Sequence, residues 1–107
     1  MPSTESLEAR VRALLAGRAD VSEMEMMGGH QFLVGGRISV SVRADTLSVR
    51  IAPEDRDRAL KLPHVVPMTI GARTAKGFVR VGLAGLRTDA QLRSWVERGV
   101  HAALARK

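Results

Sequence analysis

The sequence predicts one α+β domain, in which helices at both ends flank an antiparallel sheet of about five to six strands. Three observations lead to this prediction. Apolar residues repeat at helical spacing near both termini, they alternate with polar residues in the middle of the chain, and glycine pairs separate the alternating segments. A chain of 107 residues with 45% hydrophobic residues suits one domain, and we expect a single domain over residues 1–107.

The N-terminal helix is expected over residues 4–16. Counting from Leu7, apolar residues follow at i+4, i+7 and i+8, which places them on one stripe of an amphipathic helix. Ser3 or Thr4 is the expected N-cap, and Gly17 marks the expected end of the helix.

The first strand is expected in the segment SEMEM, residues 22–26. Methionine and glutamate alternate there, so we expect Met24 and Met26 to face the core and Glu23 and Glu25 to face solvent. The other methionines, including Met27 and Met68, are expected to fill a core that is poor in aromatic residues. A methionine-rich groove for a partner is the alternative.

Two further strands are expected in RISVSVR and TLSVRI, joined by a hairpin turn at Ala44-Asp45. Alternation predicts an inner face of Ile38, Val40, Val42, Leu47, Val49 and Ile51. The same alternation predicts an outer face of Arg37, Ser39, Ser41, Arg43, Thr46, Ser48 and Arg50.

The glycine pairs raise the question of a phosphate-binding loop. Such a loop needs a strand, a glycine-rich turn and then a helix, whereas Gly28-Gly29 and Gly35-Gly36 both lie between expected strands. We therefore predict hairpin turns, with positive φ in at least one glycine of each pair.

The second half of the chain is expected to contain a short helix, a strand pair and a long helix. Pro53 starts the short helix, and GARTAKG, with Gly77 as a turn residue, connects the strands VPMTI and FVRVGL. The long helix begins after an N-cap at Thr88 or Asp89. Its expected apolar stripe is Leu92, Trp95, Val96, Val100, Ala103 and Leu104. We expect Leu92, Trp95, Val96 and Val100 to pack against Val40, Val42, Val49 and Ile51.

No catalytic, cofactor-binding or metal-binding residues are expected. His30, His64 and His101 are far apart in sequence, there is no cysteine, and no paired ligands occur at short spacing. Glu23 and Glu25 have the spacing of a glycosidase carboxylate pair, but their alternation with methionine favours an ordinary strand face. The sequence also has no apolar run that could span a membrane and no secretory pattern, so we expect a cytoplasmic protein without membrane contacts.

The formal net charge of +6 could favour nucleic acid or an acidic partner. Candidate contact residues for either partner are Arg37, Arg43, Arg50, Arg80 and Lys76. Single-strand binding sheets present aromatic platforms to bases, and only Phe78 is a candidate here. A solvated polar face without a function is the favoured interpretation, and a nucleic-acid surface is the alternative.

Three segments together carry a family resemblance. They are MEMMGGHQFLVGGRISVSVRADTLSVRIAPED, HVVPMTIGARTAKGFVRV and LRSWVERGVHAALA, and the resemblance covers about residues 7–104. Their order and spacing resemble those of the N-terminal domain of the TfoX (Sxy) family. That family typically has phenylalanine where Met27 stands, tryptophan at Phe78 and tyrosine at Arg80.

The resemblance implies a regulatory module with no catalytic residues. Longer members resemble regulators of natural competence and carry an additional C-terminal helical domain, so we expect a stand-alone short member with a competence-like role at most. The expected function is a non-enzymatic interaction module that acts through protein–protein contacts, as a monomer or homodimer and without a cofactor. The alternative is a nucleic-acid-binding accessory protein that uses a basic sheet face.

Overall fold

The structure is a computed structural model that describes residues 6–26, 29–44, 46–70 and 72–105. Three α-helices and six strands follow the predicted order. The helices are α1 (Leu7–Leu15), α2 (Arg56–Leu60) and α3 (Asp89–Ala105). The strands are β1 (Val21–Met26), β2 (Gly29–Val34), β3 (Arg37–Arg43), β4 (Thr46–Arg50), β5 (Val65–Ile70) and β6 (Arg73–Val81). Short 3-10 helices lie at Pro53–Asp55 and Leu83–Gly85.

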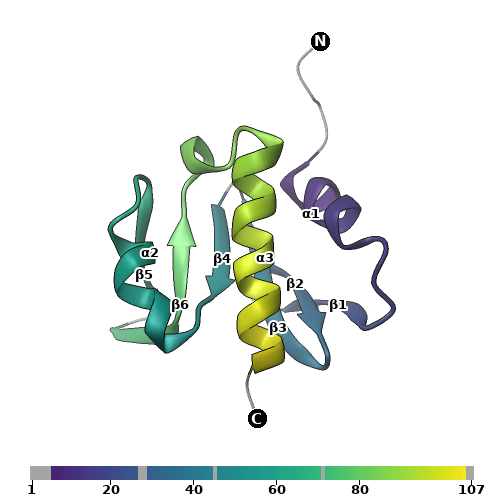
Figure 1. Cartoon of the computed structure of the whole chain (residues 1–107), viewed down its shortest axis with the longest axis horizontal. Coiled ribbons are helices and arrows are strands. Elements are labelled where there is room, and N and C mark those ends of the chain that lie inside the picture. Colours follow the sequence, from purple (N-terminus) through teal and green to yellow (C-terminus); the bar gives the residue numbers. More distant parts are fainter. Residues whose placement is uncertain (1–5, 27–28, 45, 71, 106–107) are drawn as a thin grey trace.

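The six strands form one antiparallel sheet in the order β1-β2-β3-β4-β6-β5. Helix α3 runs across the middle of the sheet, α1 lies over the β1–β2 side, and α2 lies beside β5 and β6 (Figure 1). Buried residues of all three helices share one hydrophobic cluster with the strands, so the helices cover the same face of the sheet. The fold is therefore the predicted α+β architecture, with two layers.

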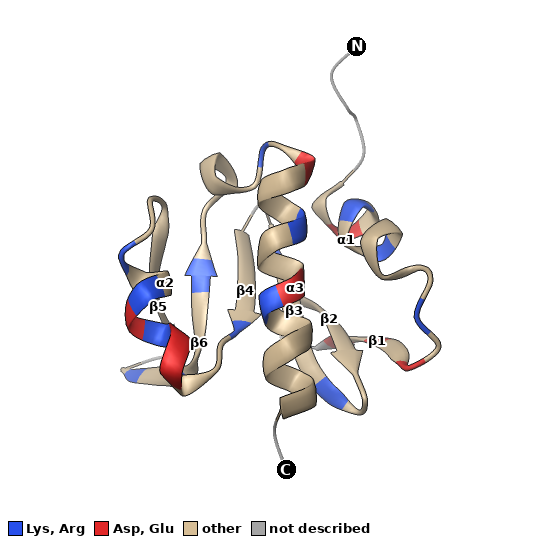
Figure 2. Ribbon diagram, in the orientation of Figure 1, with Lys and Arg blue, Asp and Glu red and all other residues tan. Residues whose placement is uncertain are grey.

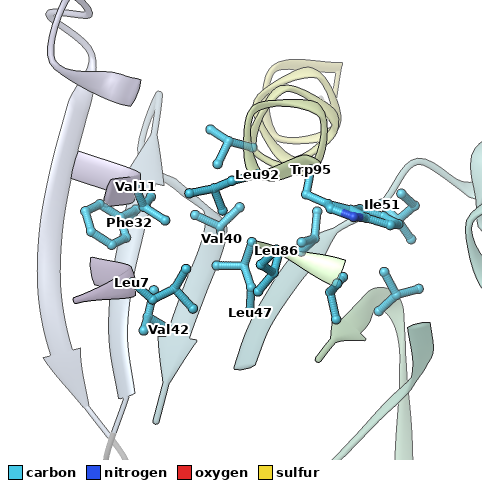
Figure 3. Packing of buried hydrophobic residues seen from close by; sticks show 14 of the residues in the cluster. Leu7, Val11, Phe32, Val40, Val42, Leu47, Ile51, Leu86, Leu92 and Trp95 are labelled. Carbon is cyan, nitrogen blue, oxygen red and sulfur yellow. The ribbon is translucent and has the colours of Figure 1, made fainter. Parts of the chain in front are cut away.

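The core confirms the packing expected for the C-terminal helix. Leu92, Trp95 and Val96 are buried in the same cluster as the valines of β3 and β4, and Val100 packs against it (Figure 3). Val11 and Leu7 of α1 lie beside Phe32 and Val42 at the other end of the cluster. Leu104 departs from the predicted stripe, because it lies near the end of α3 and is about half exposed.

Side-chain caps define the start of both long helices. Ser6, not Ser3 or Thr4, caps α1, and its Oγ accepts a hydrogen bond from the Ala9 amide at 3.1 Å. Ser3 and Thr4 lie outside the described residues. At α3, Thr88 Oγ1 accepts from the Gln91 amide at 3.1 Å while Gln91 Oε1 accepts from the Thr88 amide at 3.0 Å. This reciprocal pair satisfies two amides that the first turn leaves without helical partners.

The prediction for the faces of β1 is wrong. Glu23 lies opposite Phe32, which is fully buried, and Glu25 lies opposite His30. Directly opposed residues share a sheet face, so both glutamates are on the helix-covered face. Met24 is on the other face and is 44% exposed. The predicted alternation of Met and Glu along β1 is confirmed, but Glu23, Met24 and Glu25 each lie on the face opposite to the predicted one. Glu23 and Glu25 can lie on the helix-covered face because His30 and Arg12 provide partners for their carboxylates.

A β-bulge changes the predicted faces at the start of β3. Phe32 pairs with Val40 while Leu33 pairs with Ile38, so Ser39 has no partner in β2. An extra residue reverses the alternation on its far side. Ser39 is therefore buried, and Arg37, opposite the buried Val34, lies on the helix-covered face. Ile38 shares the opposite face with Leu33. The predicted faces of Arg37, Ile38 and Ser39 are therefore wrong.

The hairpin between β2 and β3 confirms the turn prediction for Gly35 and Gly36, whose φ angles are +61° and +84°. Gly29 is instead a residue of β2 without positive φ, paired with Met26. Gly77 lies inside β6 and is not a turn residue, because the β5–β6 ladder continues to the pair of Ile70 and Arg73. The predictions for Gly28, Met27, Asp45 and the side chain of Met26 fall outside the described residues.

Candidate functional site

The outer face, the side of the sheet away from the helices, carries three of the predicted contact residues. One row crosses all six strands through Met24, Gln31, Ser41, Ser48, Arg80 and Val66. Met24 and Val66, at the two ends of this row, are largely exposed. Ser48, near its centre, is only 5% exposed because neighbouring side chains cover it. This row is therefore apolar at its two ends and polar in its middle.

Arg50 lies flat on the outer face. Its guanidinium carbon is 4.9 Å from the centre of the Phe78 ring, and its Nε donates a hydrogen bond to the Ile38 carbonyl. A guanidinium over an aromatic ring is stabilised by the ring quadrupole. The same contact covers the one aromatic ring that the sequence offered as a stacking platform for a base. Arg50 and Phe78 thus contact each other on the outer face, and the Phe78 ring is covered by the Arg50 side chain.

The five predicted contact residues divide into three groups. Arg43, Arg50 and Arg80 lie on the outer face, on three neighbouring strands. Arg37 lies on the helix-covered face because of the bulge. Lys76 is exposed and lines a separate cleft of about 540 Å³ near the end of α3. The structure therefore brings three of the five together.

The charges of the described residues are distributed over the whole molecule. Lysine and arginine occur on α1, α2, α3 and several strands, and acidic residues lie between them on the helices (Figure 2). Ion pairs join several of these charges, such as Arg98 to Asp55 and Arg18 to Asp20. Figure 2 accordingly shows basic residues on several elements, with acidic residues interspersed among them.

A second candidate site lies under α1, where His30 meets three carboxylates. Nε2 of His30 is 2.6 Å from Glu23 Oε1, and Nδ1 is 3.3 Å from Glu8 Oε2 and 3.5 Å from Glu25 Oε2. Arg12 of α1 binds the same Glu23 with two hydrogen bonds, of 2.7 and 2.9 Å. Glu8, Glu25 and His30 are the described residues whose ligand atoms lie close enough to hold a metal ion.

This network shifts the ionisation of its members. Hydrogen bonds from Arg12 and His30 lower the pKa of Glu23 from 4.5 to about 2. The hydrogen bond to Glu23 raises the pKa of His30 above 6.5, because it favours the charged imidazolium. The pKa of Arg12 is also raised, mainly by its hydrogen bonds to Glu23. The cluster is therefore a strongly coupled group of charges that holds α1 against the β1–β2 hairpin.

Sequence reasoning missed this cluster for two reasons. It treated each histidine separately, and it placed Glu23 and Glu25 on the wrong face of β1. The available signal was the register of the hairpin, because pairing Met26 with Gly29 places Glu25 opposite His30. The contributions of Glu8 and Arg12 depend on the docking of α1, which local sequence does not determine.

The sequence profile of the TfoX N-terminal domain matches residues 13–103. The chain belongs to this family. The match includes the whole sheet and nearly all of α3, so the resemblance seen in three short segments extends over most of the chain.

A crystal structure of a protein from Pseudomonas syringae has the same fold, with a TM-score of 0.65, and the match covers 95% of this chain and 100% of that one. The two sequences are 12% identical, so the likeness concerns the fold alone. No curated protein matches the chain. Within the described residues, no helix is both long enough and apolar enough to cross a membrane.

Proposed function

We propose that this TfoX N-terminal domain is a non-catalytic regulatory module that binds another protein through the outer face of its sheet. The observation that carries the proposal is the uncovered outer face itself. Antiparallel sheets with one solvated face normally alternate apolar and polar residues, yet Met24, Leu33, Ile38, Val66 and Phe78 all lie on this face.

The chemistry of the outer face indicates the kind of partner. Its exposed methionine and valine offer apolar contacts, and unbranched methionine adapts to surfaces of different shape. Arg43 and Arg80 lie on the same face, so a partner with apolar side chains bordered by carboxylates matches it best. Arginine is favoured at such interfaces because its planar donors bind carboxylates in pairs.

The alternative function is binding of nucleic acid by the same arginines. Three arginines on neighbouring strands support it, since guanidinium groups bind phosphates. Two observations weaken it. Arg50 covers the ring of Phe78, and basic residues also occur on α1, α2 and α3, on the other side of the sheet. We therefore favour a protein partner.

The test compares two matched variants of the tag-immobilised protein in a native cell extract. Val66→Asp changes the outer face, and Leu104→Asp changes an equally exposed leucine at the end of α3, with exposures of 52% and 51%. Bound proteins are identified by mass spectrometry, and each captured protein is then purified and titrated against both variants. We expect a partner that binds the parent and Leu104→Asp but binds Val66→Asp at least about tenfold more weakly.

Two outcomes would contradict the proposal. Equal binding to both variants would remove the outer face from the interaction. Loss of the captured proteins after nuclease treatment, together with an affinity that falls steeply with salt, would favour the nucleic-acid alternative. Thermal melting of both variants provides the control for folding.

A further inference from the structure

A cleft of about 530 Å³ opens between the start of α1 and the β1–β2 hairpin, on the side of the sheet opposite the outer face. Its lining residues are Ser6, Leu7, Glu8, Glu25, Gly29, His30, Val42 and Ala44. The side chain of His30 is 14% exposed, and its Nδ1 is shielded from solvent. The cleft thus contains two carboxylates that are accessible to solvent and one imidazole nitrogen, Nδ1 of His30, that is not.

The buried nitrogen has no hydrogen bond. Nδ1 of His30 lies 3.3 Å from Glu8 Oε2 and 3.5 Å from Glu25 Oε2, but neither contact has hydrogen-bond geometry. The two carboxylates therefore approach Nδ1 closely without forming a hydrogen bond with it. A buried polar atom without a partner is rare in folded proteins and requires an explanation.

The distances from Nδ1 to the two carboxylates match those between neighbouring ligands of one metal ion. Zinc bonds of about 2.0–2.2 Å place neighbouring donors of a tetrahedron roughly 3.3–3.6 Å apart. The two distances from Nδ1, 3.3 and 3.5 Å, lie in this range, and all three ligand atoms are within 4.8 Å of one another. An ion on the lone-pair axis would give Nδ1 the partner that it lacks.

The opposite side of the ring is already arranged for metal binding. Nε2 contacts Glu23 at 2.6 Å, and Arg12 holds Glu23 in turn. Metal-binding histidines usually donate the N–H of their second nitrogen to a carboxylate, which fixes the tautomer and the ring orientation. With the proton on Nε2, the lone pair of Nδ1 points into the cleft.

We propose that Glu8, Glu25 and Nδ1 of His30 bind a divalent transition-metal ion, with zinc as the best match. One imidazole with two carboxylates suits zinc or manganese better than calcium, which takes oxygen ligands only. Glu8 belongs to α1, whereas Glu25 and His30 belong to the β1–β2 hairpin. The ion therefore joins the N-terminal helix to the edge of the sheet, and water completes its coordination.

The site goes beyond the proposed function, because it lies on the other side of the sheet and no partner protein is needed for it. It also departs from the sequence-based expectation that the histidines bind no metal. Protons compete with the ion for His30, whose surroundings include Glu8, Glu23, Glu25 and Arg12, so zinc affinity should rise with pH.

The experiment titrates zinc chloride into tag-free, EDTA-treated protein by calorimetry and follows the imidazole nitrogens by NMR. We expect one site, a displacement of the imidazole nitrogen signals of His30 that is largest at Nδ1, and no change at His64 or His101. Glu25→Gln should weaken binding at least about tenfold, since it removes one charged ligand. Glu25 is 81% exposed, so this variant should fold normally.

Glu54→Gln is the matched control, because this exposed glutamate lies at the start of the 3-10 helix before α2, far from α1 in the sequence. Its zinc affinity should equal that of the parent. Three results would overturn the proposal: no binding at millimolar zinc, equal affinity of Glu25→Gln and Glu54→Gln, or a response at His64 or His101 in place of His30. Any of them would leave His30 as an imidazolium paired with Glu23.

Discussion

Gly99 lies where α3 comes closest to the sheet, and replacing it with alanine tests the packing directly. A Cβ atom at this position would lie 2.7 Å from the Ser39 carbonyl oxygen, 2.8 Å from Val40 Cγ1 and 2.9 Å from Ser39 Oγ. Such distances are shorter than van der Waals contact, and the carbonyl oxygen is part of the bulged backbone and cannot rotate away. Helix α3 must therefore move from the sheet to accommodate one methyl group.

Two opposing effects determine the magnitude. Alanine is favoured over glycine in a helix by roughly 0.5–1 kcal/mol, which would stabilise the variant if space were available. Overpacking a well-packed core typically costs about 1–3 kcal/mol. Because three atoms clash and one of them is backbone, we expect the second effect to dominate and Gly99→Ala to lose about 2 kcal/mol of unfolding free energy. The melting temperature should fall by roughly 8–10 °C.

Urea unfolding followed by fluorescence provides the assay, because Trp95 is the single tryptophan and is buried in the core. Ser94→Ala is the matched control, since Ser94 is an exposed residue of the same helix and its replacement should change stability by less than about 0.5 kcal/mol. If Gly99→Ala is as stable as Ser94→Ala, the close approach of α3 to the bulge in β3 is wrong.

Three further predictions concern the core, a turn and the ionic cluster. Trp95→Ala should lower stability by about 3–5 kcal/mol through loss of buried area and cavity formation, and a melting temperature within a degree or two of the parent would contradict the packing. Gly36→Ala should cost about 1–2 kcal/mol from backbone strain alone, because its φ is +84° and no atom is close, whereas Gly17→Ala, without positive φ, should be nearly neutral by the same urea assay. Because the folded pKa of Glu23 is lowered from 4.5 to about 2, its contribution to stability is present above pH 4.5 and is lost as pH falls towards 2. In Glu23→Gln, the urea midpoint should therefore fall less steeply between pH 4.5 and 2 than in the parent, and stability at neutral pH should be about 1 kcal/mol lower. An unchanged dependence of the urea midpoint on pH in this range would refute the Arg12–Glu23–His30 network.

Much of the fold was predictable because local patterns and the final structure agree. The stripe of α3, the alternation of β4 and the positive φ values at Gly35 and Gly36 each follow from nearby residues alone. The wrong predictions concern strand faces, because an alternating pattern is compatible with either face of the sheet being buried. Alternation shows that Met24 and Glu23 occupy opposite faces, but only the docking of α1 determines which face the helices cover.

The candidate sites were less predictable than the fold because they depend on exceptions to regular structure. One extra residue in β3 moved Arg37 away from the other arginines, and no glycine or proline at Ser39 indicated the bulge. The cluster around His30 combines residues from α1, β1 and β2, and its carboxylates belong to an otherwise ordinary strand pattern. Arg43, Arg50 and Arg80 were placed correctly, because no irregularity separates them from the alternation of their strands.

The order of the strands also affects how the chain reaches its native state. Four of the five ladders join strands that are consecutive in sequence, and only β4 and β6 pair across an intervening strand and helix. Short loops close at little entropic cost, so the β1–β4 meander and the β5–β6 hairpin can each form from local contacts. We expect the long-range pairing of β4 with β6, in which Val49 lies opposite Val79, to form after these local contacts. Amide exchange along β4 should therefore report on opening of the whole domain, whereas β1 and β5, at the sheet edges, exchange through smaller local openings.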